Sequence, residues 1–329
     1  MRQRLTPSRL RLAAQGGFAV FLAWTCARFV AHVRWALGQS ETWVPKPPAV
    51  EGFLPISALM AAKRLLFTGA YDPIHPAGLT IFLALLGMSF LWRKGFCGQL
   101  CPVGLVANLL ERLGRRLGVA WQPGRTGRRV LAAPKYLLLA GFGYATLSMS
   151  AEDIESFLRA PFNLVADTKM LLFFARPSAL TLGVLGALAA ASVLIPAFWC
   201  RALCPYGALL GLFSWLSPTA VTRDADACVS CGRCAKACPV GLPVDTVLRV
   251  TSPECQGCAE CVSACPAPGC LGVRFAGRPV PWWSIAVGSL AILVGASIIA
   301  DALGSWQSPI PAPMARRMHM LLLGDLPGF

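Results

Sequence analysis

The segment CVSCGRCAKACP spans residues 228–239, and CQGCAECVSACP follows at residues 255–266. Both have the pattern C-x2-C-x2-C-x3-C-P, in which three closely spaced cysteines bind one [4Fe–4S] cluster and the fourth binds the other cluster. Gly232 and Gly257 allow each loop to turn backbone N–H groups toward sulfur. The pattern predicts two clusters with the ligands Cys228, Cys231, Cys234 and Cys265 for the first, and Cys255, Cys258, Cys261 and Cys238 for the second.

Zinc and disulfides are the alternatives for so many cysteines. Zinc sites usually combine two separate C-x2-C pairs rather than runs of four cysteines that end in Cys-Pro. Disulfides are rare in the cytoplasm, where thiols stay reduced, and the charge distribution described below predicts a cytoplasmic position for residues 228–266. We therefore favour iron–sulfur clusters.

The composition is that of a membrane protein. Of the 329 residues, 56% are hydrophobic and only 14% are charged, whereas soluble proteins carry about 25% charged residues. The formal net charge is +15, but the basic residues cluster beside apolar segments, as the positive-inside rule expects. We therefore do not expect the protein to bind nucleic acid.

Apolar segments predict about five transmembrane helices in a bacterial inner membrane. Residues 1–11 contain four arginines and no acid, and residues 93–135 contain nine basic residues and one acid, so both are expected in the cytoplasm. The same topology puts the cysteine runs in the cytoplasm and the C-terminus outside. The predicted spans are residues 12–37, 77–92, 136–149, 179–199 and 282–300.

The predicted domains follow this order along the chain. A four-helix membrane core covers residues 1–221, a two-cluster segment covers residues 222–275, and a fifth span with an outer tail covers residues 276–329. Three further segments are too short or too charged to cross a bilayer and are expected as surface helices: residues 56–67, 105–113 and 314–323.

The membrane core contains an internal repeat. FCGQLCPVG at residues 96–104 matches WCRALCPYG at residues 199–207, and each follows a predicted span. The two halves would be parallel repeats related by a pseudo-twofold axis along the membrane normal. Such an axis would bring four cysteines together: Cys97, Cys101, Cys200 and Cys204.

These four cysteines suggest a third metal site. Our hypothesis is a third [4Fe–4S] cluster, while zinc, a dithiol relay and a structural role stay open. Pro102 and Pro205 suit the first position of a helix, which leaves Cys101 and Cys204 at its cap. The helix dipole and nearby basic side chains are expected to favour the thiolates. These basic residues are Arg93, Lys94 and Arg201.

The chain resembles the membrane-bound polyferredoxins through its C-x3-C-P motifs at 97–102 and 200–205 and its double run at 228–266. The resemblance covers residues 10–275. It extends to the membrane subunit of the periplasmic nitrate reductase quinol dehydrogenase, the methylamine-utilisation ferredoxin-type protein and the membrane core of the nitrous-oxide reductase maturation protein. It implies an α-helical membrane protein with a bacterial-type ferredoxin segment, although the span and tail after residue 280 depart from the nitrate-reductase type.

The few remaining polar residues offer weaker candidates. His32 and His75 could together ligate a haem, but a single histidine per helix is more often an ordinary polar residue, so we do not expect haem. His75 and Asp72 could instead lie beside a quinone head group. Cys26 is expected to be inert packing, and Cys270 to be a non-ligand because eight ligands are already present.

The resemblance and the motifs together predict one-electron transfer between a quinone pool, or a cytoplasmic donor, and a partner redox protein. The chain would be an electron-transfer component and a candidate subunit of a quinol dehydrogenase, while its own enzyme activity stays undecided. Two alternatives remain: a reductase that assists the maturation of a metalloenzyme, and a redox-sensing membrane protein.

Overall fold

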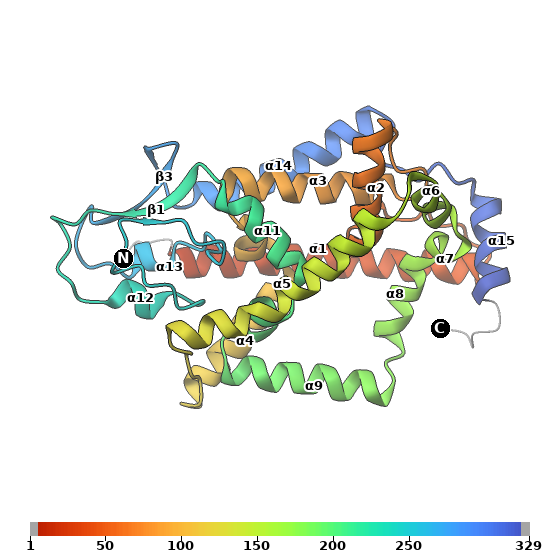
Figure 1. Cartoon of the computed structure of the whole chain (residues 1–329). Helices are drawn as coiled ribbons and strands as arrows, with labels where there is room; N and C mark the ends of the chain where they lie inside the picture. The colour runs from red at the N-terminus through yellow and green to blue at the C-terminus, as the bar shows by residue number, and fades with distance from the viewer. Residues whose placement is uncertain (1–5, 324–329) are drawn as a thin grey trace. The chain divides into compact units, whose positions relative to one another are not determined.

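The computed structural model describes residues 6–323, which are mostly helical and include one small antiparallel sheet (Figure 1). The longer helices are α1 (Pro7–Ala36), α2 (Pro55–Thr68), α3 (Pro76–Trp92), α4 (Pro102–Arg116), α5 (Arg125–Ser148), α8 (Ala166–Ala175), α9 (Ala179–Leu194), α11 (Pro205–Trp215), α14 (Ser284–Ala302) and α15 (Ala312–Leu323). The shorter ones are η1 (Pro48–Phe53), η2 (Phe96–Leu100), α6 (Ala151–Arg159), α7 (Pro161–Leu164), α10 (Phe198–Ala202), α12 (Arg233–Ala237) and α13 (Glu260–Ser263). The strands are β1 (Thr219–Arg223), β2 (Arg249–Val250), β3 (Leu271–Phe275) and β4 (Arg278–Val280).

The chain forms two compact units. The first comprises residues 1–19, 85–140 and 183–293, and the second comprises residues 20–84, 141–182 and 294–329. The first unit contains every cysteine except Cys26. These units cut across the predicted domain boundaries at residues 221 and 275, which stay a prediction.

The described residues contain three helices that are long and apolar enough to cross a membrane, namely α1, α5 and α14. Helices α8 and α9 would form a fourth span if taken together, but they are bent by 77° relative to each other. Helix α3 is apolar but only 17 residues long. The protein is therefore a membrane protein with three or four candidate spans, and the predicted total of five is not established.

Backbone breaks explain why two predicted spans are short. Helix α3 ends at Trp92 because Arg93 has a left-handed backbone with φ of 57°. Helix α9 ends at Leu194 rather than at residue 199, because Pro196 cannot continue a helix. Helix α5 is longer than the predicted span 136–149, since residues 125–135 are helical where the sequence analysis predicted an inner loop.

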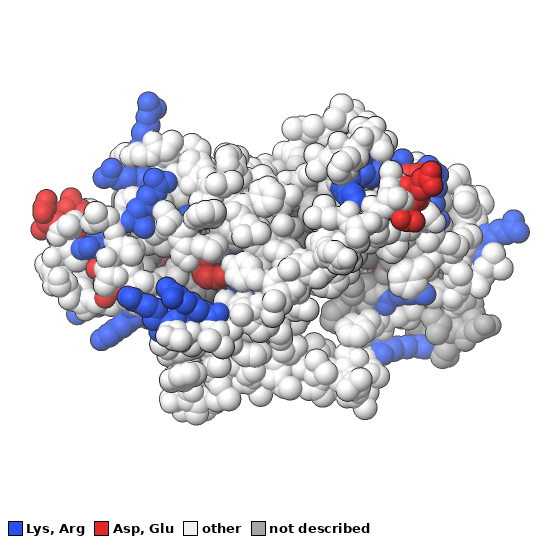
Figure 2. Space-filling view, in the orientation of Figure 1, with Lys and Arg blue, Asp and Glu red and all other residues white. Residues whose placement is uncertain are grey.

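The surface of the candidate spans is apolar. Leu137, Tyr144 and Leu147 of α5 are more than 70% exposed, as is Leu180 of α9. Figure 2 shows broad areas of the visible face without a charged residue. Such exposed apolar surface is what lipid-facing helices require.

The three segments predicted as surface helices are helical. They correspond to α2, α4 and α15. Helix α4 carries Arg112, Arg115 and Arg116 on a helix whose other side is apolar, which suits a helix lying along a membrane surface.

The sheet lies in the first unit and has the strand order β2-β1-β3-β4. Figure 1 labels β1 and β3. Val221 of β1 lies opposite Val250 of β2 and Val273 of β3. These valines pack in one apolar cluster with several cysteines of the two runs. The sheet begins at Thr219 and ends at Val280, slightly outside the predicted two-cluster segment at 222–275.

A buried ionic network holds the second unit together. Lys46 Nζ lies 2.8 Å from Glu51 Oε1 and 2.7 Å from Asp167 Oδ2, and His75 Nδ1 lies 3.3 Å from Glu51 Oε1. Burial alone would raise the pKa of Glu51, but the Lys46 ammonium and the hydrogen bond from His75 hold it below its ordinary value. The network therefore stabilises the fold above the unfolded pKa of Glu51 and loses this effect as pH falls through the folded pKa.

We expect Lys46→Met to destabilise the protein by about 3–5 kcal/mol, because it leaves two buried carboxylates without their cation. The measurement is thermal or chemical unfolding in detergent. Lys169→Met is the matched control, since the Lys169 ammonium lies 4.3 Å from the centroid of the Phe162 ring and outside this network. Equal unfolding of the two variants would contradict the assigned role.

Candidate iron–sulfur centres

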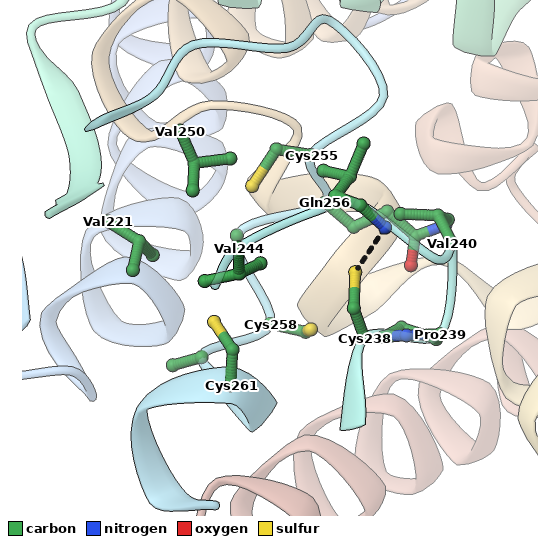
Figure 3. A pocket seen from close by; sticks show the side chains of 13 residues that line it. Val221, Cys238, Pro239, Val240, Val244, Val250, Cys255, Gln256, Cys258 and Cys261 are labelled. Atoms are coloured by element: carbon green, nitrogen blue, oxygen red, sulfur yellow. Dashed lines mark hydrogen bonds between the residues drawn. The ribbon is translucent and has the colours of Figure 1, made fainter. Parts of the chain in front are cut away.

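One cavity in the first unit is surrounded by Cys238, Cys255, Cys258 and Cys261. Figure 3 shows their sulfur atoms directed toward the space between them, with Val221, Val244 and Val250 alongside. The Leu242 N–H donates to Cys238 Sγ over 3.3 Å, a bond that stabilises a thiolate (Figure 3). These are the four cysteines predicted for the second cluster.

A second cavity contains the cysteines predicted for the first cluster. It is lined by Cys228, Cys231, Cys234 and Cys265, and also by Cys270. Cys231 is exposed, whereas the four cysteines of the other cavity are at most 9% exposed. The first site is therefore the more accessible of the two.

Left-handed residues occupy matching positions in the two cysteine loops. Ser230 and Gly232 have φ of 51° and 67°, and Gly257 and Ala259, which flank the corresponding cysteine, have φ of 64° and 58°. Such backbone turns consecutive N–H groups toward one point and forms a concavity for an anion. Non-glycine residues rarely adopt this conformation. Its presence at both matching positions indicates that the two loops hold equivalent groups.

Each cavity offers at least four cysteine thiols, the donors that an iron–sulfur cluster needs. Among the residues that the structure describes, no three His, Cys, Asp or Glu side chains converge on a position for a single metal ion. Zinc would require all of its thiolates within about 2.3 Å of one ion. The cysteines of a cluster bind different irons and stand farther apart. Both cavities therefore fit the predicted clusters.

The four C-x3-C-P cysteines also come together. The thiols of Cys97, Cys101, Cys200 and Cys204 interact electrostatically with one another, and all four are half-buried. Cys101 and Cys204 are the N-cap residues of α4 and α11, as the following prolines predicted. The Gly207 N–H donates to Cys204 Sγ over 3.2 Å. Both helices therefore aim their N-termini at the cysteine cluster.

The sequence analysis predicted that the C-x3-C-P cysteines favour the thiolate form. Without a bound metal, this prediction is wrong. Burial raises the pKa of Cys97, Cys101 and Cys204, and it raises the pKa of Cys200 to about 12. Of the three basic neighbours named from the sequence, only Lys94 acts on these thiols. A bound metal would have to displace the protons and supply compensating positive charge.

Arg93 and Arg201 have other partners. Arg93 donates to the carbonyls of Thr219 and Ser252 and so joins the end of α3 to the sheet region. Arg201 donates to Gln122 Oε1 and to the carbonyl of Pro196. The sequence analysis missed these roles because Thr219, Ser252 and Gln122 are distant from the arginines along the chain.

Besides Lys94, the structure brings Lys135 to the C-x3-C-P cysteines, which the sequence analysis did not predict. Lys135 is fully buried, and its ammonium lies 2.5 Å from Glu254 Oε2 and interacts with Cys200 and Cys204. Lys94 lies 3.7 Å from the same carboxylate oxygen. Two buried cations therefore share one carboxylate beside the C-x3-C-P cysteines. The sequence analysis had Lys135 in a cytoplasmic loop, and nothing in the sequence predicted that it lies beside these cysteines.

The histidines have hydrogen-bond partners in the protein. Both ring nitrogens of His75 have protein partners, because Nδ1 lies near Glu51 and Lys46 and Nε2 lies 2.7 Å from the Asn163 carbonyl. His32 Nδ1 lies 2.7 Å from the Val44 carbonyl and the His32 ring stacks on Phe29. Asp72 Oδ1 accepts from the N–H groups of Ile74 and His75.

The C-x3-C-P loop packs directly on the second cysteine run. A Cβ atom at Gly98 would overlap the Gln256 carbonyl oxygen. Gln99 Nε2 donates to the Gly257 carbonyl over 3.2 Å, and Arg11 donates to Gln256 Oε1 over 3.3 Å. The backbones that carry Cys97 and Cys255 are therefore in contact.

Comparisons with known proteins agree with this arrangement. Residues 74–119 and 177–223, which contain the two C-x3-C-P motifs, each match the family described as a 4Fe-4S binding domain. Residues 220–266 match the 4Fe-4S dicluster domain. The same description at two places supports the internal repeat. No solved structure is significantly similar to the chain.

The fold and the cysteine sites define a membrane protein with iron–sulfur binding domains. The chain is 36% identical over 94% of its length to YccM of Escherichia coli, named as a presumed electron transport protein, and covers 88% of it. It is 29% identical over 57% of its length to the methylamine utilization ferredoxin-type protein MauN of Methylorubrum extorquens, covering 61% of that protein. It is 31% identical over 46% of its length to the regulatory protein NosR of Pseudomonas aeruginosa, covering 21% of it. The chain belongs to the membrane-bound polyferredoxin family of iron–sulfur electron transport proteins.

We expect Gly98→Ala to weaken the packing between the two loops, because the added methyl group collides with backbone rather than with a movable side chain. The cost should be about 1–3 kcal/mol, measured as a lower unfolding midpoint in detergent. Gly87→Ala in α3 is the control, since a Cβ at residue 87 meets nothing within 4 Å. If the two variants are equally stable, the loops do not touch as described.

Proposed function

We propose that this protein carries electrons through three [4Fe–4S] clusters, from the ferredoxin segment to the C-x3-C-P cysteines. When bound, each cluster accepts and releases one electron. Cys228, Cys231, Cys234 and Cys265 would hold the first cluster, and Cys255, Cys258, Cys261 and Cys238 the second. Cys97, Cys101, Cys200 and Cys204 would hold the third.

The observation that carries the proposal is the contact between Gly98 and Gln256. It joins the loop of Cys97 to the loop of Cys255, so the third site adjoins the second. The first site shares the ferredoxin segment with the second and has the exposed Cys231. These contacts support a continuous series of sites from the exposed Cys231 to the half-buried C-x3-C-P cysteines.

Charge balance also favours an anionic group at the third site. Lys94 and Lys135 are buried beside these cysteines and share the single carboxylate of Glu254. A buried cation without a partner is costly. Four thiolates around a cluster would provide the missing negative charge, whereas four neutral thiols would not.

The distribution of basic residues suggests how the protein is oriented. Arginines cluster in residues 1–11 and around α4, which supports an inner-membrane protein with its N-terminus and ferredoxin segment in the cytoplasm and its C-terminus outside. The partners would be a quinone pool or a cytoplasmic donor on one side and a redox protein on the other.

We expect about twelve irons per chain, with matching acid-labile sulfide, in protein purified anaerobically in detergent. Replacing both Cys97 and Cys200 by serine should lower this to about eight, because only the third site loses ligands. Iron and sulfide analysis with EPR of the reduced sample measures both values. Cys26→Ser, outside the first unit, should leave the iron content unchanged.

About eight irons in the unmutated protein would mean that it has no third cluster. The C-x3-C-P cysteines would then be better explained as a dithiol relay or a site for another metal, as a maturation reductase would use.

Lys94→Met should make the reduction potential of the third cluster more negative, because the ammonium stabilises the reduced, more negatively charged form. A shift on the order of 60 mV is equivalent to about 1.4 kcal/mol for one electron. Potentiometric titration followed by EPR measures it. Lys94 is preferred to Lys135 because the 2.5 Å ion pair of Lys135 with Glu254 remains intact. Lys169→Met makes the same charge change in the second unit and should leave the potential in place.

A further inference from the structure

The cavity of the first cluster contains a fifth cysteine. Cys270 is 2% exposed and lines the cavity together with the four predicted ligands. Its thiol interacts directly with those of Cys228 and Cys265. It is therefore a neighbour of two ligands and not an isolated buried cysteine.

The position of Cys270 is fixed by the main chain. Its N–H donates to the Ala267 carbonyl over 3.3 Å, and its own carbonyl accepts from the Asp224 N–H over 2.8 Å. Strand β3 begins at the next residue and is paired along its length with β1. The thiol is thus held against the cavity by regular structure.

The second cluster has no counterpart to this thiol. Cys270 follows Cys265 by five residues, and the residue that follows Cys238 by five is Pro243. The cavity around Cys238 is lined by four cysteines only, among the residues described. The fold of the cysteine run therefore does not require a cysteine at this position.

The greater exposure of the first site suggests a role for the Cys270 thiol. The first site has the exposed Cys231 and the partly exposed Cys228 and Cys265, whereas the ligands of the second site are all buried. An accessible cluster is the one that oxidants reach, and exposed thiolates are the most readily oxidised. A buried thiol beside it is protected from the same reaction.

We propose that Cys270 is a reserve ligand of the first cluster, able to replace Cys265 or Cys228. When one of these sulfurs is lost, the Cys270 thiol releases its proton to water and binds the iron left without a cysteine. One iron–thiolate bond replaces another and no electron is transferred. The inference rests on the proposed ligands of the first cluster and not on the third cluster.

The test compares Cys265→Ala with Cys238→Ala, which remove equivalent ligands from the two halves of the run. We expect Cys265→Ala to keep the iron content of the unmutated protein, with an altered EPR signal from the first cluster. Cys238→Ala and the double variant Cys265→Ala with Cys270→Ala should each lose about four irons. Iron and sulfide analysis and EPR are made on anaerobically purified protein.

Loss of about four irons from Cys265→Ala alone would overturn the inference. If neither ligand variant folds, Cys270→Ala decides, because it keeps all eight predicted ligands. On exposure to air it should lose iron from the first cluster faster than the unmutated protein, and equal rates would overturn the inference. Fewer than about eight irons in the unmutated protein would instead overturn the ligand assignment itself.

Discussion

Negatively charged sulfur in an apolar interior is the constraint on which the first unit depends. Burial raises the pKa of the C-x3-C-P thiols, so a cluster can bind only where the protein supplies positive charge or N–H donors. The chain provides both. Left-handed residues such as Ser230 and Ala259 turn N–H groups inward, the N-termini of α4 and α11 begin at cysteines, and buried lysines stand beside the third site.

The apolar core around the ferredoxin segment includes cysteines of both runs. The four-stranded sheet is short, and its valines pack in one cluster with cysteines and with Ile285, Trp92 and Trp282. The clusters would then form part of the core, and metal binding would contribute to folding. The close approach of Gly98 to Gln256 extends this packing to the C-x3-C-P loop.

The two iron–sulfur regions differ in how they use their cysteines. The eight-cysteine run builds both of its cavities from one continuous segment, with matching backbone conformations in its two halves. The third site needs two segments about one hundred residues apart, brought together by the internal repeat. Local geometry is therefore sufficient for the first two sites, while the third depends on the packing of helices.

Much of the candidate site could be predicted because cysteine spacing has a direct chemical meaning. The two runs, the repeated C-x3-C-P motif, the helix starts at Pro102 and Pro205 and the surface helices all follow from local pattern. The span lengths were predicted less well. Hydropathy gave the end of α3 correctly, but it does not register the early end that Pro196 imposes on α9 or the start of α5 at Arg125.

The sequence by itself determined the metal chemistry, the membrane class and the repeat, because these depend on residue type and on spacing along the chain. Only the tertiary structure decided that Lys135 and Glu254 lie beside the C-x3-C-P cysteines and that Cys270 joins the first cavity. It also decided that Arg93 serves the sheet and not the thiols. The physical reason is that charge and burial act through space, and the partners involved are separated by up to about one hundred and sixty residues of chain.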